Sequence, residues 1–179
     1  MLQVLLLGSL LPVKAQNAVL CTAGQLDSLI LNNTKPYKIL YVYCTYCKPA
    51  QYNKTLDSLI VAHNSDSIAF FPVTYESWND VAPYLVKHKM ENRVYMLQSE
   101  KKNKRFLFVT VGPNPVAEAA DYLLKFDSSA VNVGLGGYVI LDRNNRPILH
   151  SDYKISYPVQ KKTGVDPDYM ALLDFIRRH

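Results

Sequence analysis

The chain has few cysteines, no concentrated block of charge of one sign and no apolar run long enough to cross a membrane comfortably. Its three cysteines include one close pair, whereas a structural zinc site needs four ligands and would recruit the others from distant segments. The 20 Lys and Arg and the 15 Asp and Glu residues are spread out, which argues against a nucleic-acid-binding protein. The one basic run, residues 100–105, is expected to be a solvated hairpin tip between two strands. A length of 179 residues suits one domain with a core.

The longest apolar run is MLQVLLLGSLLPV at residues 1–13, and small residues follow it at the positions that a signal peptidase recognises. No Lys or Arg precedes this run, which departs from the usual signal peptide. We predict a signal peptide over residues 1–15, cleaved after Ala15, and a mature domain over residues 16–179 that is exported to a bacterial periplasm. Cleavage removes Lys14, so 19 Lys and Arg face 15 acids and the net charge falls from +5 to +4. A buried N-terminal strand or helix is the alternative.

The mature chain alternates between helical and strand-like patterns of apolar residues. Helices are expected over residues 22–33, 48–63, 78–90, 114–126 and 166–179, the first of them capped by Thr22. Strands are expected over residues 35–43, 66–75, 93–98, 105–112, 136–142 and 147–152. The strands at 93–98 and 105–112 are predicted to pair across the basic run, and those at 136–142 and 147–152 across an Asn-containing turn. This order predicts an α/β sandwich with helices on both faces of a central sheet.

Cys44 and Cys47 stand two residues apart at the end of the strand expected over 35–43. Cysteine attacks as the thiolate, and a helix N-terminus lowers the thiol pKa through its free N–H groups and its dipole. We expect Cys44 to lie where the next helix begins, which favours a redox pair. A structural disulfide, a metal site and simple packing remain open. Further metal ligands would have to come from Cys21, His63, His88 or His150, although Cys21 by itself is expected to be a buried packing residue.

The segments KPYKILYVYCTYCKPA at residues 35–50 and GGYVILDRNNRPILH at residues 136–150 resemble the thioredoxin superfamily, in particular its exported TlpA-like branch of thiol–disulfide oxidoreductases. The resemblance extends to the last helix and covers most of the mature chain. It implies a thioredoxin-like three-layer sandwich, with a central mixed sheet and helices on both faces.

The same resemblance implies an activity and partners. Cys44 would be the exposed nucleophile and Cys47 the sulfur that resolves the mixed disulfide with a substrate. The substrates would be thiols or disulfides of other exported proteins, and electrons would come from a membrane-borne thiol partner, so no bound cofactor is required. A different class of function is the alternative: a thioredoxin-fold binding or accessory module whose disulfide is structural.

Several positions depart from the family pattern. Gly136 stands where the family has a cis-proline, and we predict that Gly136→Pro preserves or raises disulfide exchange if the Leu135–Gly136 bond turns cis. Lys38 falls near the place of the family's buried acid, so the sequence indicates no proton acceptor. Pro49 follows Cys44 by five residues, where it removes a helical hydrogen bond. The tyrosines around the pair are expected to pack in the sheet, with a peptide-docking surface as the alternative: Tyr41, Tyr43 and Tyr46.

Overall fold

The computed structural model describes residues 17–47, 50–63, 66–99, 104–106, 109–111, 114–130 and 132–179. Its strands are β1 (Ala18–Cys21), β2 (Tyr37–Val42), β3 (Ile68–Thr74), β4 (Val94–Leu97), β5 (Lys104–Phe106), β6 (Val109–Val111), β7 (Tyr138–Asp142) and β8 (Pro147–His150). Its helices are α1 (Ala23–Leu31), α2 (Ala50–His63), α3 (Trp78–His88), α4 (Pro115–Leu123), α5 (Tyr153–Thr163) and α6 (Pro167–Arg178). The predicted signal peptide and Pro49 lie outside the described residues.

Six of the strands form one mixed sheet in the order β1-β4-β3-β2-β7-β8. The first four of these run parallel to one another, whereas β7 is antiparallel to both β2 and β8. Strand β2 lies at the centre, paired on one side with β3 and on the other with β7, and five of its six residues are buried. An apolar strand covered on both faces is expected at this position. The predicted mixed sheet is confirmed.

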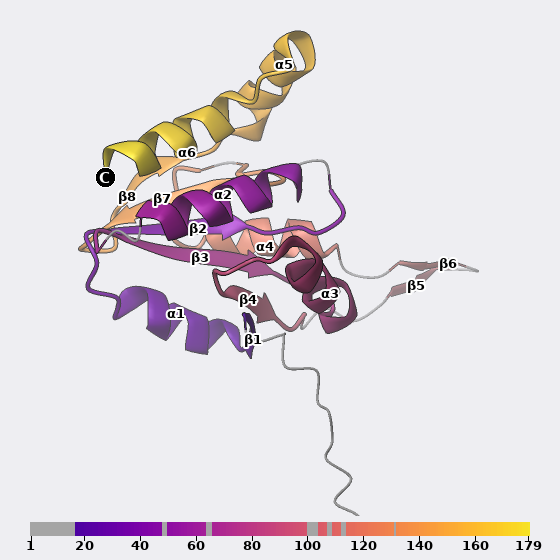
Figure 1. The fold of residues 1–179 in the computed structure, drawn as a ribbon. Helices are drawn as coiled ribbons and strands as arrows, with labels where there is room; N and C mark the ends of the chain where they lie inside the picture. Colours follow the sequence, from indigo (N-terminus) through magenta and orange to yellow (C-terminus); the bar gives the residue numbers. More distant parts are fainter. Residues whose placement is uncertain are drawn as a thin grey trace, which may run out of the picture.

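Helices cover both faces of the sheet, as predicted (Figure 1). One core cluster joins one face of β2 and β3 to α1 and α4, through residues such as Ile30 and Ala119. A second cluster joins the other face to α2, α3 and α6, through residues such as Leu56, Leu85 and Leu172. Figure 1 shows α2 and α6 above the sheet and α1 below it. The alternation of side chains along β2, with Ile39 and Tyr41 on one face and Leu40 and Val42 on the other, builds both cores.

Local capping explains where several of these helices begin. Thr22 caps α1 in a capping box, because its side chain accepts from the Gln25 N–H while the Gln25 side chain accepts from the Thr22 N–H. Asn114 and Asp166 cap α4 and α6, each followed by a proline in the first turn of the helix. Asn145, at φ 62°, supplies the positive backbone angle that the turn between β7 and β8 requires.

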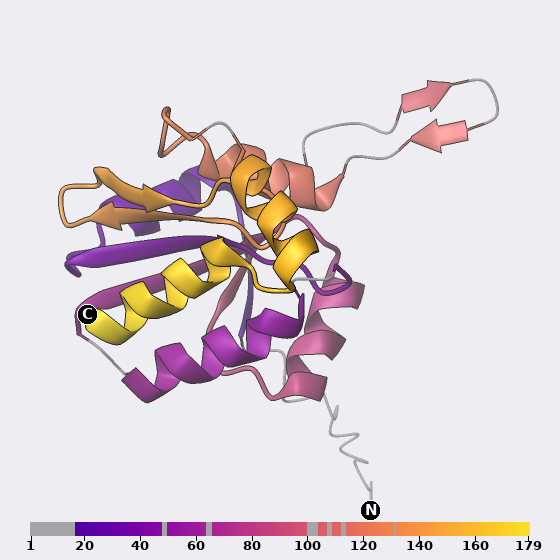
Figure 2. The same cartoon turned by 90° about the horizontal axis from the view of Figure 1, so that it is seen from above.

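The predicted pairing of residues 93–98 with residues 105–112 is wrong. Strand β4 instead lies inside the six-stranded sheet, parallel to β1 on one side and to β3 on the other. All four of its residues are buried, as expected of a strand with neighbours on both sides. Within the described part of the chain, strands β5 and β6 pair only with each other, and Figure 2 draws them apart from the large sheet. Among the described residues, no helix is both long and apolar enough to span a membrane.

Candidate functional site: the Cys44–Cys47 turn

The chain leaves the centre of the sheet immediately before the cysteine pair. The Val42 N–H donates to the Gly137 carbonyl oxygen at 2.8 Å, and the Tyr43 N–H donates to the Val73 carbonyl oxygen at 2.8 Å. Cys44 therefore follows a residue that is hydrogen-bonded to the neighbouring strand β3. The backbone on both sides of β2 fixes where the cysteine turn starts.

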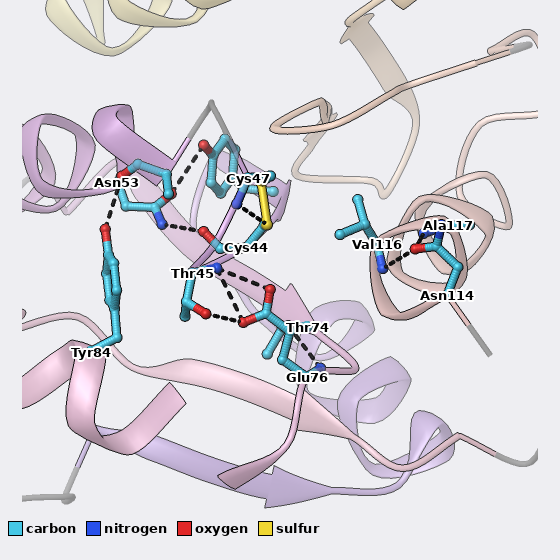
Figure 3. Close-up of a disulfide and its surroundings, with 12 residues drawn as sticks. Cys44, Thr45, Cys47, Asn53, Thr74, Glu76, Tyr84, Asn114, Val116 and Ala117 are labelled. Atoms are coloured by element: carbon cyan, nitrogen blue, oxygen red, sulfur yellow. Dashed lines mark hydrogen bonds between the residues drawn. A yellow bond between two sulfur atoms is a disulfide. The ribbon is translucent and has the colours of Figure 1, made fainter. Parts of the chain in front are cut away.

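Cys44 and Cys47 form a disulfide, and their Cα atoms are 5.9 Å apart (Figure 3). The Cys47 N–H donates to Cys44 Sγ at 3.0 Å. A donor in this position stabilises negative charge on the Cys44 sulfur, since hydrogen bonding to the charged form lowers the pKa of an acid. The turn thus favours Cys44 as the sulfur that carries the thiolate once the disulfide is reduced.

Two expectations about this turn are wrong. Helix α2 begins at Ala50, three residues after Cys47, so neither cysteine lies in the first turn of the helix. The influence of a helix dipole falls off within that first turn, and the Cys47 N–H is the donor that reaches the sulfur instead. Cys44 is also not the exposed cysteine, because it is only 2% exposed and packs in the core cluster with Val42. Cys47 is partly exposed, so it is the more accessible member of the oxidised pair.

A side chain from helix α2, Asn53, holds Cys44 in place from one side and is itself bound by Tyr41 of β2. The Asn53 side-chain amide donates to the Cys44 carbonyl oxygen at 2.9 Å, and the Tyr41 hydroxyl donates to Asn53 Oδ1 at 3.2 Å. Asn53 and Tyr41 are both buried. The first turn of α2 and the middle of β2 are therefore connected through a buried polar network to the backbone of the cysteine turn.

A buried carboxylate, Glu76, holds the turn from the other side. It accepts from the Thr45 N–H at 2.9 and 3.1 Å and from the Thr45 hydroxyl at 2.6 Å. Glu76 is 4% exposed, and its own N–H donates to Thr74 Oγ1 at 3.1 Å. Burial raises the pKa of Glu76 and repulsion from Asp80 adds to this, whereas the hydrogen bonds from Thr45 act in the opposite direction.

Glu76 is the site residue that the sequence analysis missed, and the register of the sheet explains its place. Strands β2 and β3 are parallel, with Val42 opposite Val73, so continuing the same offset of 31 residues brings Thr45 opposite Glu76. Parallel neighbouring strands end at the same edge of a sheet. An acid two residues beyond β3 was the available signal, and it becomes meaningful only once β2 and β3 are known to be neighbours.

Lys38 does not take part in the cysteine turn. It is fully buried near the beginning of β2, where its Nζ donates to the Arg143 carbonyl oxygen at 3.3 Å and to Asn145 Oδ1 at 2.5 Å. Burial lowers the pKa of this lysine, while the charge of Asp142 partly offsets the effect. The position that we compared with the family's buried acid therefore serves the turn between β7 and β8.

The loop before β7 has no cis peptide bond, which corrects the expectation for Gly136. Gly136 lies at φ 67°, whereas proline is fixed near −65°, so a proline does not fit this backbone conformation. The loop borders a cavity of about 70 Å³ that lies between it, α5 and the start of α6, with Gly136, Tyr157 and Asp168 among its lining residues.

The remaining candidate residues lie in separate environments. Cys21 is a buried free thiol in the same core cluster as Cys44. His88 packs against the ring of Tyr84, and His150 pairs with Asp127. Within the described part of the chain, no group of three or more metal-binding side chains occurs. His63 ends α2. Of the three tyrosines around the pair, the first two are buried in the sheet and the third is 65% exposed: Tyr41, Tyr43 and Tyr46.

No protein-family model and no curated protein matches the chain. Solved structures that resemble it include a thioredoxin from Wuchereria bancrofti, at 15% identity and a TM-score of 0.46, over 85% of this chain and 87% of that one. The thioredoxin domain of a thiol-disulfide oxidoreductase from Bacteroides vulgatus matches at 11% identity and a TM-score of 0.44, over 72% and 80% of the two chains. A thiol:disulfide interchange protein from Chlorobium tepidum matches at 14% identity and a TM-score of 0.42, over 72% and 79%. These are distant likenesses.

Proposed function

We propose that this chain is a thiol–disulfide oxidoreductase that exchanges disulfides with other proteins through Cys44 and Cys47. The observation that carries the proposal is the disulfide between these residues, in a turn where the Cys47 N–H donates to Cys44 Sγ. A disulfide over two intervening residues closes a small loop and contributes little to stability, so a purely structural role explains it poorly. Two of the similar solved structures are named for thiol–disulfide exchange.

In the reducing direction, the Cys44 thiolate attacks one sulfur of a substrate disulfide. A bond forms between Cys44 and that sulfur, and the second substrate sulfur leaves as a thiolate and takes up a proton from solvent. Cys47 then loses its proton and attacks Cys44 Sγ, which forms the intramolecular disulfide and releases the first substrate sulfur as a thiolate. Two electrons pass to the substrate. Cys44 is buried in the disulfide-bonded state, so the reduced turn has to present this sulfur to a protein substrate.

The cellular setting of the proposal follows from the apolar N-terminal run. We place the protein outside the cytoplasm, in a bacterial periplasm, after cleavage behind Ala15. Its substrates are then thiols and disulfides of exported proteins. The oxidised pair is returned to the dithiol by a membrane-borne thiol partner, so the protein itself carries no redox cofactor.

One observation favours the second candidate function, a thioredoxin-fold binding module with little redox activity. The loop before β7 has neither a proline nor a cis bond, and Gly136 has a left-handed backbone conformation. The groove in which family members hold a substrate strand is therefore built differently here. In this alternative the disulfide only closes the turn, and the surface around it serves for partner contact.

Trapping of a mixed disulfide distinguishes the two candidates. Reduced Cys47→Ser protein keeps the attacking thiol but lacks the resolving sulfur, so it should accumulate a covalent complex with insulin that disappears on adding dithiothreitol. Non-reducing electrophoresis and mass spectrometry of the linked peptides measure this complex. The matched variant Cys44→Ser should trap several-fold less. Absence of any complex with Cys47→Ser favours the binding module, and equal or stronger trapping by Cys44→Ser would assign the attack to Cys47.

A further inference from the structure

We propose that Glu76 is a positioning residue of the redox turn, acting through Thr45 to set how readily the Cys44 thiol ionises. The role rests on the proposed function, in which Cys44 attacks as a thiolate. No described hydrogen bond joins Glu76 to either sulfur. Glu76 acts instead on the residue that directly follows Cys44.

The first argument is geometric. Both donors of Thr45, its N–H and its hydroxyl, are directed to the Glu76 carboxylate, at distances from 2.6 to 3.1 Å (Figure 3). Charge-assisted hydrogen bonds of this kind are roughly twice as strong as neutral ones, so they fix the orientation of the peptide group after Cys44. Glu76 is itself held at the end of β3 by the bond from its N–H to Thr74. The turn is thereby attached to the sheet.

The second argument concerns which donors are left for the sulfur. In a turn of this kind, successive N–H groups can all point toward a thiolate and stabilise it. Here the Thr45 N–H is occupied by Glu76, and the donor to Cys44 Sγ is the N–H of Cys47. Glu76 therefore determines both the shape of the turn and the share of its N–H groups that the sulfur receives.

The third argument is electrostatic. The Glu76 carboxylate is hydrogen-bonded to Thr45, the residue next to Cys44. When this carboxylate is ionised, it disfavours a second negative charge on the Cys44 sulfur. The described ionisable groups that interact with Glu76 are Asp80 of α3 and three tyrosines, Tyr43, Tyr46 and Tyr84. Burial raises the pKa of each tyrosine above 10, so these rings stay neutral and Asp80 is the other charge. Because burial also raises the pKa of Glu76, its ionisation and that of Cys44 are coupled titrations.

The experiment follows alkylation of Cys44 against pH in chemically reduced protein, with labelling at each cysteine quantified by peptide mass spectrometry. The amide of Glu76→Gln still accepts from the Thr45 N–H but carries no charge. In the wild type, we expect the alkylation of Cys44 to rise over a wider pH range than the ionisation of a single group would give. In Glu76→Gln the profile should become a single step, with its midpoint about one pH unit lower. That is about a tenfold change in thiolate stability, which makes the reduction potential about 30 mV less negative.

Two further variants make the result specific. Asp57→Asn removes another carboxylate that is 4% exposed and accepts two backbone N–H groups, those of Glu91 and Asn92, away from the redox turn. It should leave the Cys44 midpoint unchanged. Thr45→Ala removes the hydroxyl that lowers the pKa of Glu76, so Glu76 stays neutral to higher pH and the Cys44 profile should move to lower pH, in the same direction as in Glu76→Gln. This variant also tests the role of Glu76 if Glu76→Gln does not fold.

Unchanged Cys44 profiles in Glu76→Gln and Thr45→Ala would overturn the role of Glu76, as would an equal shift in Asp57→Asn. Alkylation of the reduced thiol needs no exchange activity. A shifted profile in a protein that traps no substrate would therefore refute the oxidoreductase while keeping the effect of Glu76 on the thiol. Normal trapping with unshifted profiles would keep the oxidoreductase and refute the effect of Glu76 on the thiol.

Discussion

At the level of single residues, the redox turn is held between two strand ends and a helix. Cys44 is fixed by Asn53 through its carbonyl oxygen, and Thr45 is fixed by Glu76 through its N–H and hydroxyl. The sequence indicated the cysteine pair because a local motif after an apolar strand is visible in a single segment. It did not indicate Glu76, since the contact spans 31 positions and depends on the register of β2 against β3.

The exposure of the two cysteines could not be predicted from the sequence either. Cys44 is buried because it continues the inward-facing set of Leu40 and Val42, on the face covered by α1 and α4. Cys47 packs against the same core cluster but is partly exposed. Which sulfur is accessible depends on how the chain bends after β2, and the C-x-x-C spacing alone does not determine that bend.

Gly137 gives a residue-level prediction about the wall of the site. A Cβ added at this position would overlap the Val133 carbonyl oxygen, and the Gly137 carbonyl is the acceptor for Val42 just before the cysteines. Gly137→Ala should therefore lower the free energy of unfolding by about 3 kcal/mol or more, in the range of severe strain or overpacking. Denaturant unfolding monitored by circular dichroism measures the change.

The control for this variant is Gly24→Ala in α1, where a new Cβ meets no atom within 4 Å. Alanine has the higher helix propensity, so this change should raise the free energy of unfolding by about 0.5–1 kcal/mol. A Gly137→Ala protein as stable as the wild type would contradict the close backbone approach before β7.

At the level of elements, sequence patterns predicted a helix or strand correctly where that element has its own apolar face and caps. Helices α1, α4 and α6 were expected close to their observed limits for this reason. Helix α5 was not expected, because its single buried residue is Ser156 and Pro158 lies inside it. Strand β1 was missed because its four residues gain their partner only from β4, more than 70 positions away. The same long-range pairing explains why β4 was assigned to the wrong neighbour.

Strand β8 is connected to the segment after α4 by a partly buried pair, in which His150 Nδ1 lies 2.8 Å from Asp127 Oδ2. Burial alone would raise the pKa of Asp127, but hydrogen bonds from Ser129 and His150 bring it below the usual 3.8. A carboxyl whose pKa is lower in the folded state contributes stability above its unfolded pKa and loses it as the pH falls through the folded value. The contribution is therefore present near neutral pH and disappears below about pH 4.

Asp127→Asn should accordingly lower the free energy of unfolding by about 1–3 kcal/mol at pH 6–7, with the difference shrinking below pH 4. Urea unfolding at several pH values tests this. The control is Asp174→Asn, which removes an exposed carboxylate lying 3.6 Å from Arg177 and should change little. A constant difference across the pH range would show that the charge of Asp127 is not what stabilises the β8 contact.

At the level of the whole molecule, the α/β sandwich brings the ends of two parallel strands together at one edge of the sheet. The cysteines follow β2, Glu76 follows β3, and the loop before β7 supplies the Gly137 carbonyl beside them. None of these parts is a neighbour of another in sequence. The fold class could be predicted because alternating helices and buried strands permit few architectures, whereas the composition of the site follows from strand order.

The central claim is that Cys44 and Cys47 exchange electrons with protein disulfides. The most direct test is insulin-disulfide reduction at neutral pH, with dithiothreitol as electron donor and the chain present in catalytic amounts. The wild-type protein should precipitate insulin chains many times faster than dithiothreitol alone, and Cys44→Ser should reduce the rate to that background. A wild-type rate no higher than background, from protein whose Cys44–Cys47 disulfide is reduced under the same conditions, would contradict the account.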